Sequence, residues 1–510
     1  MMNGAKKSDS LIVPAKPANK AGHPAAELVE GSSGTKRNAK LQSTVRTQSR
    51  GAVSQAQDRI RGAVTRGKKE KLTALLHHIT VDVLRQAFFN LKKRAAPGVD
   101  GVTWVDYAAD LDRNLTDLHD RVHRGAYRAL PSRRRYIPKA DGRQRPLEIA
   151  ALEDKIVQRA TVAVLEAIYE TEFLGFSYGF RPGRSQHDAL DALVVGIDRT
   201  KVNHILDADI RSFFDEVSQP TLVRFLQHRI GDQRILRLVQ KWLKAGVLED
   251  QQVVTSDKGT GQGSVASPLL ANVYLHYVFD LWAARWRRRE ATGDMIVLRY
   301  ADDIVVGFEH EADARRFWDE MRARLEEFSL SLHPEKTRLI EFGRLAAARR
   351  ARRGLGKPET FTFLGFTFIC GRSRRGRFLI KRKTRRDRMR ARLREIKEEL
   401  RRRRHQSIPE QGHWLRQVLE GYYGYHAVPT NLPALSAFWI HVLHLWRRSL
   451  GRRSQRASMT WARMTRLAKG WLPRPRILHP WPNQRFAVKH PRWEPDARIG
   501  PVRICAGGAQ

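Results

Sequence analysis

The chain is poor in cysteine and has no long apolar stretch. Its 510 residues include two cysteines, Cys370 and Cys505, and no CxxC spacing. This excludes a cysteine-rich zinc module and argues against a disulfide framework. No apolar run approaches the ~20 residues that span a bilayer, and the run at 11–15 is too short for a signal peptide. We therefore expect no membrane partner and a cytoplasmic, nucleic-acid-associated protein; the basic, serine-containing N-terminus leaves an organellar location open.

Acidic residues are scarce relative to basic ones. The chain has 94 Lys and Arg against 53 Asp and Glu, a formal net charge of +41 and a pI near 11.0. This excess predicts a polyanionic partner. Hydrophobic residues make up 41% of the chain, enough for a folded body of two or three domains rather than a wholly disordered basic protein.

The other motifs of the chain are best interpreted relative to one stretch, MIVLRYADDIVVGF at 295–308. Apolar runs flank Asp302 and Asp303, which predicts two buried strands with the carboxylates at the tip of a β-hairpin. On these residues alone, a role in building the turn is as well supported as a catalytic one.

A second acidic strand lies upstream, in HILDADIRSFFDEV at 204–217. Asp207 and Asp209 face the same side of an extended strand, and the pattern alone does not say which of them would bind metal. Nucleotidyl transfer needs carboxylates from separate elements that converge on two Mg²⁺ ions. The strand and the hairpin together therefore predict the catalytic floor of a polymerase palm.

A basic ribbon and a glycine-rich segment lie on either side of that strand. RRRYIPKADGRQRPLEIA at 133–150 predicts two strands with a turn at Asp141-Gly142, from which Lys139 and Arg145 would reach a triphosphate; an ordinary solvated hairpin is the alternative. The segment KGTGQGSVASPLL at 258–270 combines glycines, which let backbone approach a ligand closely, with a Ser-Pro pair that resembles an N-cap and first-turn proline.

In combination, the segments resemble the sequence blocks of group II intron reverse transcriptase–maturases over roughly residues 80–485. The blocks follow that family's order: APGVDG, YIPKADGRQRPLEI, FLGFSYGFRPGRS, DIRSFFDEV, GQGSVASPLLANVYL, RYADDIVV, HPEKTRLIEFG and FTFLGF. The resemblance implies an α+β fold: a right-hand polymerase of fingers and antiparallel palm sheet, followed by an α-helical thumb. It also implies an RNA-directed DNA polymerase (reverse transcriptase) with two Mg²⁺ ions as cofactor.

The family's site residues carry over position by position. Its palm metal ligands, which are also the catalytic residues, correspond to Asp209, Asp302 and Asp303. Asp209 is preferred over Asp207 because Phe214 follows where such enzymes place an aromatic that excludes a ribose 2′-hydroxyl. In the family, the basic pair of the ribbon holds the triphosphate, a glutamine lies beneath the nucleotide, and a lysine assists the pyrophosphate leaving group. The implied dNTP-binding residues are Lys139, Arg145, Phe214, Gln262 and Lys336.

The chain departs from the family pattern at two places. Gly261 stands where the family usually has proline, and Glu148 lies in RPLEIA where the family has RPLGIP. The added carboxylate either alters substrate affinity or points away from the nucleotide. Neither change touches a metal ligand.

Arginine dominates from 372 to 404, while an apolar helical stripe runs from Met389 to Leu400. Two more helical stripes follow, and the three resemble the family's thumb, its maturase or X domain. The expected RNA-binding residues are Arg385, Arg386, Arg401 and Arg402. The expected regions are a flexible basic arm (1–70), reverse transcriptase fingers and palm (71–370), the helical thumb/maturase domain (371–470) and a basic Pro- and Trp-containing tail (471–510). The first helix is expected after Thr80.

The resemblance implies a mobile-element protein that binds its intron RNA, assists splicing and copies the intron into DNA during retrohoming. The implied partners are structured intron RNA, an RNA template with a DNA primer, target DNA and dNTPs; the oligomeric state stays open. The tail is too short and too poor in clustered ligands for a nuclease, which indicates the endonuclease-lacking type. Two alternatives remain: a splicing-only RNA-binding maturase with a dead polymerase, and a relative that serves phage defence or a CRISPR system.

Overall fold

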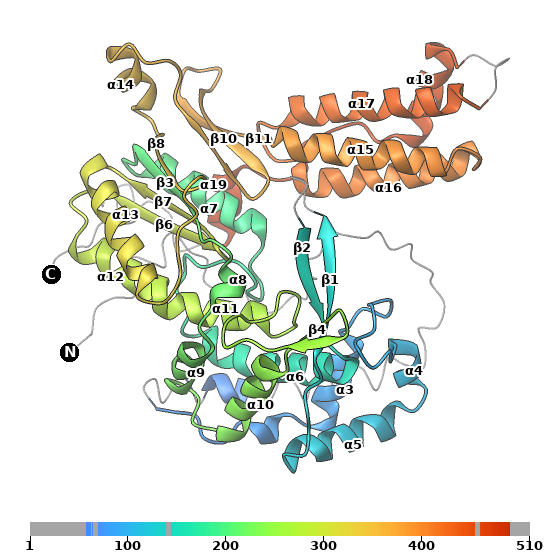
Figure 1. Cartoon of the computed structure of the whole chain (residues 1–510). Helices are drawn as coiled ribbons and strands as arrows, with labels where there is room; N and C mark the ends of the chain where they lie inside the picture. Colours follow the sequence, from blue (N-terminus) through green and yellow to red (C-terminus); the bar gives the residue numbers. More distant parts are fainter. Residues whose placement is uncertain (1–57, 63, 65–69, 139–143, 454–458, 490–510) are drawn as a thin grey trace.

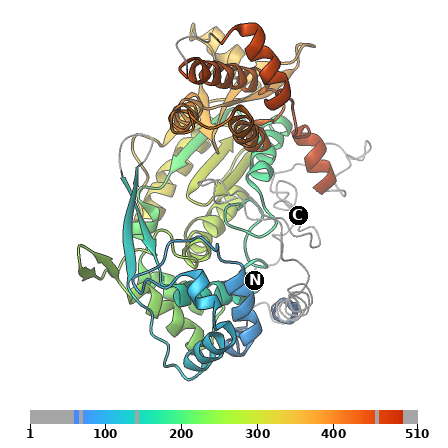
Figure 2. The same cartoon turned by 90° about the vertical axis from the view of Figure 1, so that its right-hand side faces the viewer.

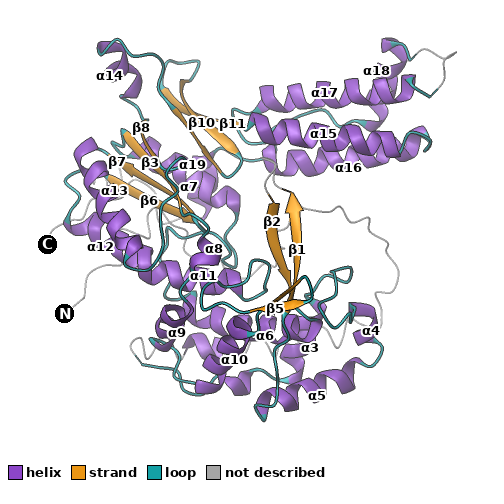
Figure 3. Ribbon diagram, viewed as in Figure 1, coloured by secondary structure: helices purple, strands orange, loops and turns teal. Residues whose placement is uncertain are grey.

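The computed structural model describes residues 58–62, 64, 70–138, 144–453 and 459–489 (Figures 1 and 3). Helices and largely antiparallel sheets both contribute to it, which confirms the α+β prediction. Within these ranges no helix is both long and apolar enough to cross a bilayer. Lys139 and the Asp141-Gly142 turn lie outside the described residues.

The central sheet has four strands in the order β6-β7-β3-β8, and each neighbouring pair is antiparallel. Its strands are β3 (His204–Asp209), β6 (Met295–Tyr300), β7 (Asp303–Phe308) and β8 (Arg338–Glu341). The predicted hairpin is confirmed, because β6 and β7 pair in register with Tyr300 opposite Asp303, which leaves Ala301 and Asp302 in the turn.

Helices pack around this sheet and bury its apolar runs. On α13, Phe317, Met321 and Leu325 recur at helical spacing and are fully buried. The helices of this part of the chain are α7 (Gln186–Arg199), α8 (Phe213–Glu216), α9 (Gln219–Gln227), α10 (Gln233–Lys244), α11 (Ser267–Leu275), the π-helix η2 (His276–Asp280), α12 (Leu281–Arg289) and α13 (Glu311–Glu326). Of these, α7 packs on β6, and α13 packs on β3 and β7.

A second group of helices lies below the palm in Figure 1. It comprises η1 (Leu76–His78), α3 (Val81–Phe89), α4 (Trp104–Ala108), α5 (Leu111–His123) and α6 (Leu152–Tyr169). Thr80 caps α3 by accepting a hydrogen bond from the Val83 backbone, as predicted. The expectation of a flexible arm up to residue 70 is wrong at its end. Residues 58–62 and 64 are helical, because Ile60 and Val64 are buried in the main hydrophobic core.

A long two-stranded ribbon rises from this helical group toward the C-terminal helices (Figure 1). It belongs to a four-stranded sheet of order β2-β1-β4-β5, in which β1 pairs with β2 antiparallel and with β4 parallel. The strands are β1 (Ser132–Pro138), β2 (Gln144–Ile149), β4 (Val247–Glu249) and β5 (Gln252–Val254). The predicted ribbon is thus present, with Ile137 opposite Arg145.

The chain leaves the palm through a small antiparallel sheet and enters a helical bundle with its own hydrophobic core. These elements are α14 (Ala346–Arg352), β9 (Thr360–Phe363), β10 (Phe366–Arg372), β11 (Phe378–Thr384), α15 (Arg386–Arg402), α16 (Ile408–His426), α17 (Leu432–Gly451) and α18 (Trp461–Trp471). The arginine-rich stretch that begins at residue 372 contains the predicted helical stripe at Met389–Leu400 in its second part, which is α15. Its first part pairs as β11 with β10, across the expected boundary at 370/371, and the helix starts at Arg386.

The tail after α18 returns to the palm. Its last described helix, α19 (Pro482–Lys489), packs on α7, and both views place the two helices side by side (Figures 1 and 2). This contact joins elements about 290 residues apart in the chain, which no local sequence pattern indicates.

Candidate active site

Two strands and one turn supply the acidic residues of the palm. Asp209 ends β3 and lies directly opposite Asp303, which begins β7. Asp302 is in the turn between β6 and β7, next to Asp303. The structure therefore brings the three predicted acids together at one end of the sheet.

The two acids of β3 have different surroundings. Asp207 lies opposite Val305, and its carboxylate is 3.8 Å from a guanidinium nitrogen of Arg338. Asp209, one step nearer the hairpin on the same strand face, accepts a 2.5 Å hydrogen bond from Nζ of Lys336. Asp209 is thus the β3 acid in register with the hairpin carboxylates.

The electrostatics of these acids fit a cation site. Desolvation, followed by the charges of Asp302 and Asp209, raises the pKa of Asp303 to about 7. Desolvation also raises the pKa of Asp302, against the lowering effect of Arg145 and Lys336. Crowded carboxylates repel one another, and their oxygens are the donors that a hard divalent cation prefers. Within the described residues no group of three or more Asp, Glu, His or Cys side chains lies in an arrangement that could hold a metal ion as the side chains stand.

The glycine-rich loop lies between the palm and the ribbon. Gly259, Gly261 and Gly263 all have positive φ, at 90°, 64° and 112°, so the loop follows a path that side-chain-bearing residues rarely adopt. Its backbone is tied to α8, because the amide of Thr260 donates a 2.9 Å hydrogen bond to the carbonyl of Phe214. It is tied to β2, because the amide of Glu148 donates a 2.7 Å hydrogen bond to the carbonyl of Gln262. The loop thus connects Phe214 and Gln262, two of the predicted dNTP-binding residues.

Ser267 differs from its predicted role. It is the first residue of α11 rather than the N-cap, and the helix has no side-chain cap hydrogen bond. Its hydroxyl instead donates to the carbonyls of Thr260 and, at 2.8 Å, Gly261. The hydroxyl therefore fastens the glycine-rich loop to the helix that follows it.

The two departures from the family pattern lie against each other. A Cβ built on Gly261 would come within 2.5 Å of Oε2 of Glu148. Glu148 is largely buried and forms a 3.2 Å salt bridge with Arg134 of β1. The added carboxylate therefore points into the space that a larger residue at position 261 would need, rather than away from the loop.

Arg145 and the thumb arginines occupy separate places. Arg145 is exposed on β2, and its charge acts on Asp302. Arg385 and Arg386 lie at the start of α15, whereas Arg401 and Arg402 lie at its end, ~25 Å away for a helix of 17 residues. The four RNA-binding candidates thus form two clusters on one helix rather than a single patch.

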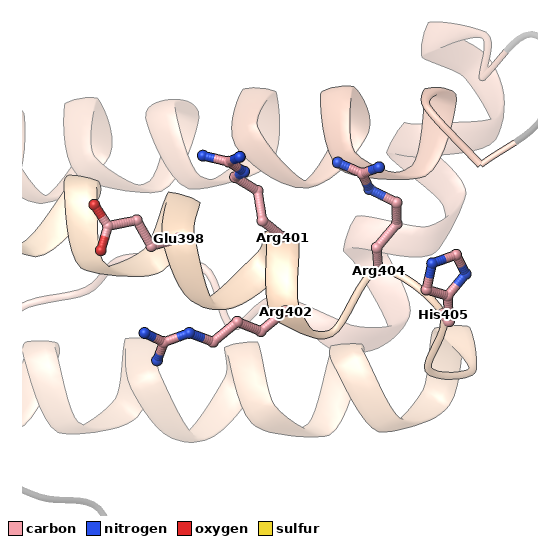
Figure 4. A pocket seen from close by; sticks show the side chains of 5 residues that line it. All are labelled: Glu398, Arg401, Arg402, Arg404 and His405. Atoms are coloured by element: carbon pink, nitrogen blue, oxygen red, sulfur yellow. The ribbon is translucent and has the colours of Figure 1, made fainter.

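The cluster at the end of α15 lines a shallow pocket (Figure 4). Its lining residues are Glu398, Arg401, Arg402, Arg404 and His405. Figure 4 shows the side chains of Arg401 and Arg404 on the same side of the helix end, with Arg402 turned away from them. Arg404 and His405 were not singled out from the sequence, although they continue the same run of basic residues.

Sequence reasoning also missed the residues that hold the turn between β6 and β7. Arg299 is completely buried beside Tyr300 and contacts Asp280, Asn272 and the carbonyl of Ala301. The available signal was a single charged residue inside the apolar run of β6, because a buried charge requires a partner. The identity of that partner depends on the tertiary fold.

Comparisons with known proteins agree with this geometry. Residues 137–368, which include the three acids and the glycine-rich loop, match the reverse transcriptase (RNA-dependent DNA polymerase) family. Protein YkfC of Escherichia coli (strain K12) is 34% identical over 312 residues, which cover 55% of this chain and 77% of that protein. The group II intron-encoded protein LtrA of Lactococcus lactis subsp. cremoris is 35% identical over 198 residues, 38% of this chain and 32% of LtrA. The chain belongs to the group II intron reverse transcriptase–maturase family, whose members are RNA-directed DNA polymerases.

Proposed function

We propose that this protein is the RNA-directed DNA polymerase of a group II intron, and that it also binds the intron RNA, assists its splicing and copies it into DNA during retrohoming. The observation that carries the polymerase activity is the register of Asp209 opposite Asp303, with Asp302 in the adjoining turn. Carboxylates that are crowded together repel one another, and a two-metal site needs such convergence from separate elements.

Asp209, Asp302 and Asp303 would hold two Mg²⁺ ions, which supply a clamp on the attacking and leaving oxygens of nucleotidyl transfer. The other residues position the nucleotide. Phe214 and Gln262 are held by the same loop, which supports roles beside the sugar and beneath the base. Arg145 of β2 would hold the triphosphate, and Lys139, which lies outside the described residues, is proposed for the same role from the sequence. Lys336 would neutralise the departing pyrophosphate.

The helical bundle that begins at Arg386 supports the role in splicing. It has its own hydrophobic core and carries basic clusters at both ends of α15. With a net charge of +41 for the chain, phosphate contacts would supply most of the affinity for a structured intron RNA. We propose it as the thumb/maturase domain, joined by β10 and β11 to the fingers and palm.

The test separates polymerisation from splicing in one set of variants. Asp302→Asn and Asp209→Asn should each abolish dNTP incorporation on an RNA template with a DNA primer, while RNA binding and splicing of the intron at limiting Mg²⁺ should continue. Asp207→Asn is the matched control, since this acid pairs with Arg338, and it should retain extension. Full extension by Asp302→Asn would remove the catalytic assignment. Wild-type protein that splices but never extends a primer would indicate a splicing-only maturase.

A further inference from the structure

Arg299 is a fully buried charge one residue before the catalytic turn begins. Its guanidinium forms a two-pronged salt bridge with Asp280 of η2, in which Nε donates at 2.7 Å and Nη2 at 2.6 Å. Asp280 is also completely buried. Such a bidentate arrangement fixes the orientation of the guanidinium plane as well as its position.

The remaining terminal nitrogen of Arg299 points to the turn. Nη1 donates to Oδ1 of Asn272 at 2.9 Å and to the backbone carbonyl of Ala301 at 3.0 Å. The amide of Asn272 in turn donates a 2.7 Å hydrogen bond to the carbonyl of Gly179. One side chain therefore connects the helix pair α11–η2 to the first residue of the turn.

The turn itself has an unusual backbone. Ala301 has a φ of 56°, in the left-handed region that residues other than glycine rarely adopt. The loop that contains Gly179 lies so close to the turn that a Cβ on Gly179 would clash with the amide nitrogen of Ala301. A non-glycine residue keeps such a conformation only where its surroundings impose it.

We propose that Asp280, Arg299 and Asn272 form a brace that holds Ala301 in this conformation and thereby sets the position of Asp302 for divalent-cation binding. Arg299 is a positioning residue: it contacts the turn that carries Asp302 and not the substrate. The inference rests on the proposed role of Asp302 as a metal ligand. The braced carbonyl belongs to Ala301, the left-handed residue, and Asp302 follows it directly in the chain, so a change in the backbone conformation of Ala301 displaces the Asp302 carboxylate.

The decisive variants are Arg299→Lys, alone and combined with Ala301→Gly. Lysine keeps the buried charge but cannot form the fork, so the half-saturating Mn²⁺ concentration of the protein–primer–template complex, measured by electron paramagnetic resonance, should rise about tenfold. The Mg²⁺ requirement for extension should rise in parallel. Glycine adopts a φ of 56° without a brace, so Ala301→Gly should recover at least half of the loss in the Arg299→Lys background. A role of Arg299 in core stability alone would show no such recovery.

Arg382→Lys is the matched control, because Arg382 is a buried arginine that is paired with Asp191 at 2.7 Å and lies outside the turn. It should lower the melting temperature and leave the Mn²⁺ titration unchanged. If Arg299→Lys does not fold, Asn272→Ser tests the same chain of contacts and should shift the titration severalfold in the same direction. If the folded brace variants bind Mn²⁺ as the wild type does and Asp302→Asn abolishes Mn²⁺ binding, the brace is overturned and the role of Asp302 stands. Wild-type Mn²⁺ binding by Asp302→Asn would instead overturn the metal-ligand assignment.

Discussion

Nζ of Lys336 donates a 2.5 Å hydrogen bond to Oδ2 of Asp209. A lysine from the loop between α13 and β8 is therefore paired with a carboxylate that is proposed to bind metal. The ammonium group compensates the charge of Asp209 when no cation is present. A divalent cation would have to displace it, and the displaced lysine would then be available to the pyrophosphate. Lys336 would therefore first pair with Asp209 and then, once metal binds, neutralise the pyrophosphate.

This relationship predicts opposite effects of Lys336→Ala on metal affinity and turnover. Removing the competing ammonium should lower the half-saturating Mg²⁺ concentration severalfold. Maximal turnover at saturating Mg²⁺ should fall about tenfold or more, because the leaving group loses a neutralising partner. Single-nucleotide extension across a Mg²⁺ series measures both quantities. An Mg²⁺ requirement that rises together with the loss of turnover would contradict the competition.

The contact between Glu148 and Gly261 predicts that substitutions at these positions are coupled. Gly261→Ala brings a Cβ against Glu148 and places a side chain at a φ of 64°, so we expect about a tenfold loss in kcat/KM for dNTP and ~1–2 kcal/mol of lost stability. The double variant E148G/G261A should recover part of this loss, since only the backbone strain remains. Gly376→Ala is the control: its φ is 74°, nothing lies within 4 Å of its Cβ, and it isolates the cost of the conformation. Strictly additive effects would show that the pair is not coupled.

The sequence was sufficient for features whose signal is local. The apolar-DD-apolar pattern predicted the β6–β7 hairpin, and alternation with turn residues predicted the β1–β2 ribbon. Thr80 was predicted as an N-cap because the capping residue and the helix it caps are adjacent. In these cases periodicity and turn chemistry act over a few neighbouring residues, so the sequence of one chain is enough to predict them.

Features that depend on tertiary partners were not predictable in the same way. Ser267 reads as a helix cap, but the carbonyls of the folded glycine-rich loop compete for its hydroxyl. The arginine-rich stretch after 372 has a local helical signal at Met389–Leu400, whereas the pairing of its first part with β10 depends on tertiary structure. The partners of Arg299, and the packing of Glu148 on Gly261, arise only when segments distant in the sequence meet in the folded chain.

The surroundings of the thumb arginines predict unequal contributions to RNA binding. Arg385 forms a 2.6 Å salt bridge with Asp387, and Arg402 lies 3.4 Å from Glu399. Within the described residues no acidic side chain lies within ion-pair distance of Arg386 or Arg401. Because a paired guanidinium is already partly neutralised, R386Q/R401Q should weaken RNA binding more than R385Q/R402Q does.

Salt titrations of RNA binding measure this difference. Removing one arginine–phosphate interaction should reduce the slope of log K against log salt by about 0.7 on single-stranded RNA, and by about 0.9 on a B-form DNA duplex used for comparison. Splicing assistance should fall more than extension on a short unstructured template. Equal slopes for R386Q/R401Q and wild type would show that these arginines belong to a solvated helix face.

His479 of the docked tail lies in a buried cluster with His187 of α7 and His426 of α16. The rings of His187 on α7 and His479 in the tail stack at 3.9 Å, and Oδ2 of Asp191 on α7 lies 3.1 Å from Nε of Arg485 on α19. Burial, followed by the charges of His479 and Arg485, lowers the pKa of His187 to about 3. Burial likewise lowers the pKa of the neighbouring His426 to about 3. Arg382 and Arg485 face the same cluster and oppose its protonation, while Asp191 is already engaged by both arginines.

Acid should therefore undock α19. When α19 undocks, His187 on α7 loses the tail that covers it and its pKa returns toward the ordinary 6.5, so the undocked state binds more protons between pH 3 and 6.5. The docked state has its full stability above about pH 6.5, and the titration of His187 destabilises it by about 1.4 kcal/mol at pH 5.5. Hydrogen exchange of residues 482–489, corrected for the intrinsic pH dependence, should show a severalfold loss of protection between pH 7.5 and 5.5.

His187→Phe keeps the stacked ring and removes the titrating group, so the protection of residues 482–489 in this variant should change less with pH. Arg485→Gln is the counterpart control, since loss of the Asp191 salt bridge should reduce protection at both pH values. If His187→Phe kept the full pH dependence of the wild type, the titration would belong to another group, and the cluster would be a structural contact only.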